Sequence, residues 1–284
     1  MIAKRRPIVW LFVFITSVFL SACSQTTTIH PDDPDKLTDQ FVYLALGVEP
    51  FLNEAPEKKV NLSKWTKPLR VRLFAAANVD STSLALEMDS LSGQFERLLG
   101  RLKLEYEIVR DDSWNFAYFF YSDAEDLLEI RDAFKEKNTN DRFKNLVRVL
   151  DLIHGAPILK SGKGCLVNTY ASNDETNKEL FGSHTYAFIF LPTYGSLDLR
   201  KACFMEESAQ ALGMLNDYGL KRPHYLTIFD DTNDGYQLTP ADILVLEALY
   251  DDRITPGMDE TELRQVLPAI FREILIRESL IAGS

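Results

Sequence analysis

Residues 203–217, with the sequence C-F-M-E-E-S-A-Q-A-L-G-M-L-N-D, predict an amphipathic helix that is ended by a glycine. Glu206 and Gln210 are four residues apart and therefore share one face of the helix, with Glu207 beside them. Gly213 suits the left-handed backbone conformation that commonly follows the last turn of a helix. The two polar residues that close the segment come where the chain would turn back under that face.

Five other stretches have the alternation or the apolar composition of β-strands. They are residues 69–75, 104–109, 115–122, 165–170 and 185–191. Turn-forming residues at 111–113 join the second and third of these strands. The last stretch is apolar on both faces, which is typical of a strand that is covered on both sides.

The remaining segments predict helices. Apolar residues recur at spacings of three and four over 84–102, so this helix packs one stripe on the sheet. Residues 124–152 predict a charged helical region with a break at 138–141. Thr239 predicts a helix N-cap, with Pro240 at the first helical position and Asp242 placed to reach back in a capping box. Asp259 and Glu262 predict a capping box that starts the last helix. The order predicts an α+β fold: a mixed twisted sheet with a long packing helix, a central motif helix and C-terminal helices.

The composition is that of an ordinary globular protein. The chain has 284 residues, 46% of them hydrophobic and 26% charged, and a formal charge of −11. This length suits one large domain or two small ones. A net negative charge argues against a nucleic-acid partner, because neutralising phosphates requires an excess of Lys and Arg.

The N-terminus has the pattern of a bacterial lipoprotein signal. Lys4, Arg5 and Arg6 precede an apolar run over residues 8–20 that is too short for an ordinary spanning helix. The run ends in L-S-A-C at Cys23, which resembles a lipobox in which the cysteine is lipidated. The alternative is an uncleaved signal anchor.

Residue 24 is Ser rather than Asp, which predicts an outer-membrane location facing the periplasm. Lipid chains would anchor the protein without spanning the bilayer. We therefore expect a signal peptide at 1–22, a lipidated tether and surface strap at 23–67, and the folded domain at 68–284. Residues 41–46 are a short helix or part of that strap.

The two remaining cysteines would lie in an oxidising compartment. Cys165 and Cys203 form an even pair there, which favours a disulfide that ties the start of the motif helix to a neighbouring strand. The alternative is two buried free thiols.

The segment E-E-S-A-Q-A-L-G-M-L-N-D resembles the motif H-E-x-x-H-A-L-G-x-x-H-D of metzincin-type zinc peptidases. By position, the zinc histidines of that family are replaced by Glu206, Gln210 and Asn216. Glu207 stands where the family has its general base. The resemblance implies a metzincin-like fold and a degenerate metal site.

Downstream residues extend the resemblance over about residues 200–258. The stretch 227–229 corresponds to the turn below the metal, with Phe229 in place of methionine, and the stretches 238–242 and 249–251 correspond to the helix that follows. The same combination, with L-Y-D-x-R-x-x-P-G-M at 249–258, resembles a family of bacterial envelope proteins described only as a domain of unknown function.

The substitutions bear directly on the chemistry. Zinc prefers imidazole and thiolate ligands, whereas Gln210 and Asn216 offer neutral amide oxygens. We therefore predict no metal and no cofactor, with Glu206, Gln210 and Asn216 joined in a hydrogen-bond network at the former metal site. The predicted role is binding or scaffolding, with a protein or peptide partner in the envelope. The alternative is a divergent hydrolase that keeps Glu207 as general base, with or without an atypical metal.

Other candidate sites are weaker. His154, His184 and His224 are scattered, as surface or core histidines usually are. Residues 161–164 (S-G-K-G) lack the full phosphate-loop pattern G-x-x-x-x-G-K-[ST] and predict a loop.

Overall fold

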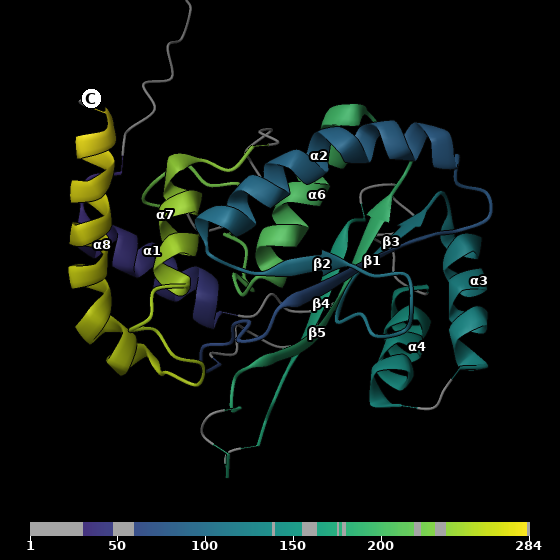
Figure 1. The fold of residues 1–284 in the computed structure, drawn as a ribbon, viewed down its shortest axis with the longest axis horizontal. Helices are drawn as coiled ribbons and strands as arrows, with labels where there is room; N and C mark the ends of the chain where they lie inside the picture. Colours follow the sequence, from purple (N-terminus) through teal and green to yellow (C-terminus); the bar gives the residue numbers. More distant parts are fainter. Residues whose placement is uncertain are drawn as a thin grey trace, which may run out of the picture.

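A computed structural model describes residues 31–47, 60–137, 140–154, 164–174, 176–177, 180–218, 223–230 and 237–282, and of the side chains at 81–90 only that of Leu84. The order of elements agrees with an α+β fold (Figure 1). The strands are β1 (Leu69–Ala75), β2 (Tyr106–Ile108), β3 (Phe116–Tyr121), β4 (Leu166–Ala171) and β5 (His184–Pro192). The helices are α1 (Pro34–Leu46), α2 (Ser81–Arg101), α3 (Ala124–Lys135), α4 (Asp141–His154), α6 (Leu197–Ala211), α7 (Pro240–Leu249) and α8 (Glu260–Ala282).

The strands form one mixed sheet in the order β2-β1-β3-β5-β4. The pairs β1–β2, β1–β3 and β3–β5 are parallel, and β4 runs antiparallel to β5 at one edge. The strands expected on either side of residues 111–113 are therefore not neighbours, because β1 lies between them. Arg72 of β1 holds the segment that joins them, since its Nη1 donates to the carbonyl oxygen of Asp111 at 2.6 Å.

Side chains of β3 pack against helices on both faces of the sheet. Tyr118 stacks on Phe204 of α6 with ring centroids 5.2 Å apart, and Phe95 of α2 contacts the same ring edge-on. Phe119 points to the opposite face, where Phe134 of α3 packs against it. Helices α2 and α6 thus cover one face and α3 with α4 the other (Figure 1). The predicted break between α3 and α4 is confirmed.

Helix α1 belongs to the core and is not a strap on the surface. Leu37, Phe41 and Leu44 are fully buried, and Phe41 packs edge-on against Phe271 of α8. Asp33 begins the helix by accepting hydrogen bonds from two backbone amides of its first turn. Helices α1, α7 and α8 form a layer beside the sheet (Figure 1).

Residues 62–65 are buried as well, so the expected start of the domain at residue 68 is wrong. Leu62 and Trp65 are almost completely buried, and the amide of Gly257 donates to the carbonyl oxygen of Leu62 at 2.8 Å. The folded domain therefore begins by Pro34. The expected signal peptide at 1–22 and the expected lipidation site Cys23 lie outside the described residues. Of the helices that are described, none is long and apolar enough to cross a membrane.

Candidate functional site

The motif helix is longer than predicted and ends where predicted. It begins at Leu197 with Ser196 as its N-cap, and its last residue is Ala211. Gly213 follows with φ +126°, a conformation that favours glycine. A Cβ atom there would lie 2.6 Å from the carbonyl oxygen of Ser63, so the close approach of the chain also requires glycine.

Two aromatic side chains satisfy carbonyl groups at the end of α6. Trp65 Nε1 donates to the carbonyl oxygen of Ala211 at 2.8 Å, and the hydroxyl of Tyr250 donates to that of Leu212 at 2.7 Å. The last carbonyls of a helix have no partner within the helix, so these donors act as a side-chain cap. Tyr250, part of the downstream motif, is thereby assigned a structural role.

Lys64 performs the same function for α7. Its ammonium donates to the carbonyl oxygens of Leu249 at 3.0 Å and Ile254 at 2.6 Å. A cation is favourable at a helix C-terminus, where the carbonyl dipoles concentrate negative charge. Burial nevertheless lowers the pKa of Lys64 to about 8, with Asp251 and Asp252 acting in the opposite direction.

The two amide residues of the degenerate motif bind different partners. Gln210 is buried, and its Nε2 donates to Oδ1 of Asp217 at 2.6 Å. Asn216 is also buried, and its Nδ2 donates to the carbonyl oxygen of Tyr43 in α1 at 3.2 Å. The backbone amide of Asn216 binds the same helix through the carbonyl oxygen of Leu44.

For Gln210 and Asn216 the predicted mutual network is therefore wrong, because the side-chain amide of each donates to a residue outside it. Gln210 stabilises the turn after α6, and Asn216 fixes that turn to α1. Neither amide contributes a charge, and each is oriented by a structural hydrogen bond, so this donor set does not fit zinc. Within the ranges given above, no three His, Cys, Asp or Glu side chains are grouped so that they could hold a metal ion.

The two glutamates of the motif differ in burial. Glu206 is half-buried, whereas the side chain of Glu207 is almost completely buried. Burial raises the pKa of Tyr121 at the end of β3, and the hydroxyl of Tyr194 and the negative charge of Glu207 add to this effect. The hydroxyl of Tyr121 donates to the carbonyl oxygen of Gly164. The buried side chain of Glu207 thus lies near the Tyr121 hydroxyl, and its negative charge opposes ionisation of that hydroxyl.

The turn after the motif is held by Asp242. This carboxylate accepts hydrogen bonds from the amides of Ile228 at 3.0 Å and Thr239 at 2.8 Å, and from the hydroxyl of Thr227. The predicted capping box between Thr239 and Asp242 is confirmed. Burial raises the pKa of Asp242 to about 6, although the three hydrogen bonds favour the carboxylate. Phe229, fully buried, completes the turn.

Cys165 and Cys203 form a disulfide, and their Cα atoms lie 5.6 Å apart. Cys165 lies directly before β4, and Cys203 lies in α6. The pairing agrees with the sequence expectation, and it links the antiparallel edge strand to the motif helix.

The three histidines in the described ranges lie apart from one another and form no metal site there. His184 is buried in β5, and its ring lies 5.3 Å from that of Trp65. The carbonyls of Ser63 and Tyr170 favour its protonated form, but neither accepts a hydrogen bond of good geometry. Burial dominates and lowers the pKa of His184 to about 4. His154 ends α4, and His224 lies 3.8 Å from a carboxylate oxygen of Asp39.

Sequence reasoning missed Lys64, Trp65 and the structural role of Tyr250. Lys64 and Trp65 lie in a short polar segment without periodicity, and the bonds of Trp65 and Tyr250 to the end of α6 span 146 and 38 residues. The place of Tyr250 in the stretch L-Y-D-x-R-x-x-P-G-M at 249–258 was the available signal.

No curated protein and no solved structure matches the sequence. A family model described as "Protein of unknown function (DUF2927)" matches residues 34–269, beginning at the first residue of α1 and ending within α8. Since this match covers most of the chain, the protein belongs to the DUF2927 family.

Proposed function

We propose that this protein is a lipid-anchored envelope protein whose metallopeptidase-like domain binds a protein or peptide partner without zinc catalysis. The observation that carries the proposal is a pair of hydrogen bonds: Gln210 donates to Asp217, and Asn216 donates to the carbonyl oxygen of Tyr43. These two residues occupy ligand positions of the metzincin-type motif, and both serve the fold instead. A domain that keeps such a frame and replaces its ligands is suited to binding.

The metzincin-like assignment is part of this proposal. It is supported by the glycine turn at Gly213, by the Thr227–Asp242 contact below it, and by a mixed sheet packed against a long helix and the motif helix. Anchoring through Cys23 and an outer-membrane location facing the periplasm rest on the lipobox-like end of the N-terminal segment. A Cys23→Ser variant should appear in the soluble fraction, whereas the wild type should sediment with outer membranes.

The catalytic part of the proposal is tested on the full-length protein. Metal analysis after purification should find less than one equivalent of any divalent metal. Crosslinking in intact cells should capture a discrete partner, and this capture should survive Glu207→Gln, which keeps the size of the buried side chain. A Glu206→Lys change, which reverses the charge of the half-buried position on the same helix, should reduce capture. Stoichiometric metal with Glu207-dependent hydrolysis would overturn the proposal.

The burial of Glu207 favours a second candidate, a divergent hydrolase with this carboxylate as general base. A base of that kind requires a water molecule within hydrogen-bond reach and a pKa that suits its task. Hydrolysis of peptide substrates by the wild type, lost in Glu207→Gln with unchanged thermal stability, would favour this candidate over a binding role.

A further inference from the structure

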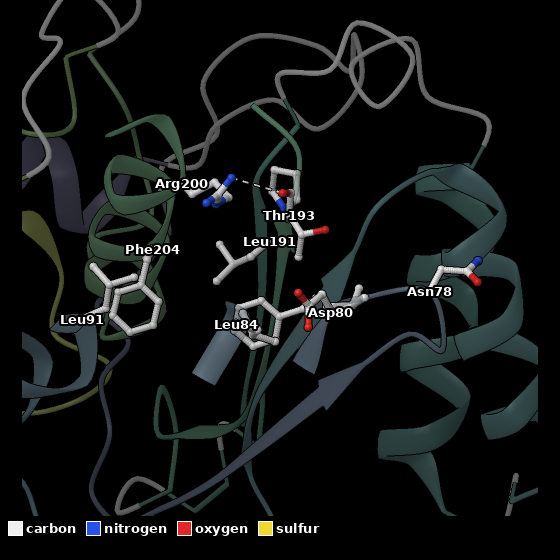
Figure 2. Close-up of a pocket in the computed structure, with 11 residues that line it drawn as sticks. Asn78, Asp80, Leu84, Leu91, Leu191, Thr193, Arg200 and Phe204 are labelled. Carbon is white, nitrogen blue, oxygen red and sulfur yellow. Dashed lines mark hydrogen bonds between the residues drawn. The ribbon is translucent and has the colours of Figure 1, made fainter. Parts of the chain in front are cut away.

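A pocket with a volume of about 160 Å³ lies at the carboxyl ends of the parallel strands, outside the degenerate motif. The turn before α2, α2 itself, the ends of β3 and β5, and the first half of α6 line it (Figure 2). The chain leaves β1 toward α2 on one face of the sheet and leaves β3 toward α3 on the other (Figure 1). Loops that leave adjacent strands in opposite directions open a crevice, which is where open α/β sheets bind ligands.

The floor of this pocket is apolar. Of the described residues that line the pocket, the apolar ones are Val79, Leu84, Leu91, Phe120, Leu191, Pro192 and Phe204. Leu91, Leu191 and Phe204 gather at its base, and each is almost completely buried (Figure 2). A cavity of about 150 Å³ lined by Leu, Ile and Phe stays dry and binds benzene. The floor therefore has the size and the chemistry to take one ring-sized apolar group.

The pocket reaches the surface between two helices. Leu197, Arg200 and Phe204 follow one another in α6 at spacings of three and four, so they share one helix face. Exposure rises along this face, from 2% for Phe204, through the half-buried Arg200, to 46% for Leu197. On α2, Leu91 is buried and Leu84, two turns before it, is half-buried. A ligand can thus enter from solvent past Leu197 and Leu84.

The polar groups around the pocket already have partners within the protein. Nδ2 of Asn78 donates to Oδ1 of Asp126, and the hydroxyl of Thr193 donates to a backbone carbonyl of β3. Arg200 donates to two backbone carbonyls of the turn before α6, and Asp80 also interacts within the protein (Figure 2). A charged ligand would lose its water without gaining a partner reserved for it, whereas an apolar group gains from burial alone.

We propose that this pocket binds an uncharged apolar group of the size of one benzene ring. The ring occupies the floor among Leu91, Leu191 and Phe204. Two sources present this chemistry, a free hydrocarbon ring and the aromatic side chain of a peptide. The proposal is independent of the function of the motif helix, because none of the degenerate ligand positions lines the pocket.

Isothermal titration calorimetry on the full-length protein in detergent tests the proposal. Toluene supplies the free ring, and N-acetyl-L-phenylalaninamide supplies the ring on an uncharged peptide unit. The titration of Leu84→Trp, whose larger side chain fills the pocket, is subtracted, so that partition of a probe into the detergent micelle cancels. Saturable binding of at least one probe beyond that of the variant is expected, and the tighter probe identifies the source. Dissociation constants above about 10 mM for both probes would overturn the proposal.

Charged probes with the same ring test the claim that the ligand is uncharged. Zwitterionic L-phenylalanine should bind at least about tenfold more weakly than N-acetyl-L-phenylalaninamide, because its charges must be desolvated or held away from the floor. Benzoate and benzylamine, one anionic and one cationic, should be weaker than toluene by a similar factor for the same reason. A charged probe that binds as tightly as its uncharged counterpart would contradict the proposal.

A second variant assigns the binding to this pocket without altering the core. Leu197→Glu places a carboxylate at the exposed mouth, in the first turn of α6, where a negative charge is favourable for the helix. It should weaken the tighter uncharged probe at least about threefold. Leu280→Glu, the same change at an exposed position of α8, is the control and should leave the affinity unchanged. Circular dichroism checks that Leu84→Trp is folded, and Leu197→Glu replaces it in the subtraction if it is not. Equal affinities of wild type, Leu84→Trp and Leu197→Glu would place the site elsewhere and refute the assignment.

Discussion

The side-chain amide of Gln210 donates a hydrogen bond of 2.6 Å to the carboxylate of Asp217, seven residues further along the chain. The two residues lie on either side of the Gly213 turn. The contact therefore joins the helix to the chain that returns beneath it. Asp217 also fixes the turn through its backbone, because its carbonyl oxygen accepts from the hydroxyl of Tyr43 at 3.2 Å.

The first prediction concerns this pair. Asp217→Ala should lower the free energy of unfolding by about 1–3 kcal/mol, because it leaves the buried amide of Gln210 without its acceptor. Chemical denaturation monitored by circular dichroism measures the change. Asp132→Ala, which removes a carboxylate from an exposed ion pair with Arg131, is the control and should change stability by less than about 0.5 kcal/mol. Equal effects of the two changes would contradict the structural role of Asp217.

The second prediction concerns the aromatic cap of α6. Trp65→Phe and Tyr250→Phe each keep an aromatic ring and remove one hydrogen-bond donor. The first change leaves the carbonyl of Ala211 without this donor, and the second does the same to the carbonyl of Leu212. Each should cost about 1–2 kcal/mol in unfolding free energy, since a buried carbonyl loses its partner. Thermal denaturation measures the loss. Tyr106→Phe, in the exposed edge strand, should be nearly neutral, and a neutral Tyr250→Phe would show that the carbonyl of Leu212 needs no cap.

Local signals account for most of the elements. The stripe in α2, the alternation in β1, the capping box of α7 and the glycine after α6 each depend on residues within a few positions of one another. The capping box of α8 was predicted on the same basis, and the amide of Glu262 donates to Asp259 at 2.9 Å as that motif requires.

The arrangement of those elements depends on contacts that local patterns do not contain. Nothing within 104–122 indicates that β1 inserts between β2 and β3, because strand neighbours are chosen by sheet packing. Asn216 was expected to bind the other motif residues, yet its partner is Tyr43, 173 positions earlier in the sequence. The burial of residues 62–65 could not be predicted for the same reason, because their partners lie far away in the sequence.

The third prediction concerns the carboxylate of Asp242, which accepts three hydrogen bonds. In Asp242→Asn the amide retains a single oxygen and turns a donor toward other donors, so stability should fall by about 3 kcal/mol. The urea midpoint measures the change. Asp259→Asn alters the exposed capping box of α8 in the same way and should cost less than about 1 kcal/mol. A loss at Asp242 no larger than at Asp259 would contradict the role assigned to burial.

The fourth prediction concerns the disulfide. Cys165 and Cys203 are separated by 38 residues, and closing a loop of that length stabilises a folded chain by about 4 kcal/mol in the chain-entropy description. Adding reductant should lower the denaturation midpoint of the wild type. The same reductant should have no effect on the double variant Cys165→Ala/Cys203→Ala. Two titratable thiols at these positions in denatured, unreduced protein would refute the pairing.

The last prediction concerns pH between about 4 and 6.5. His184 has a pKa of about 4 in the folded state against 6.5 for the free group, so the unfolded chain binds the proton more readily. Its contribution to stability is complete above pH 6.5 and is lost as the pH falls toward 4. Asp242 has a pKa of about 6 against 3.8, so the folded state binds the proton more readily and its contribution is lost as the pH rises toward 6.

The two slopes have opposite signs and similar size, about 3 kcal/mol each over the full range at 1.36 kcal/mol per pKa unit. Wild-type stability should therefore vary little between about pH 4.5 and 6. His184→Leu removes the first term, so this variant should become more stable as the pH falls. Asp242→Asn removes the second, so it should become less stable over the same range. Urea denaturation of the three proteins across this range measures the slopes. A His184→Leu variant that loses stability on acidification as the Asp242→Asn variant does would show that His184 is not the group that opposes Asp242.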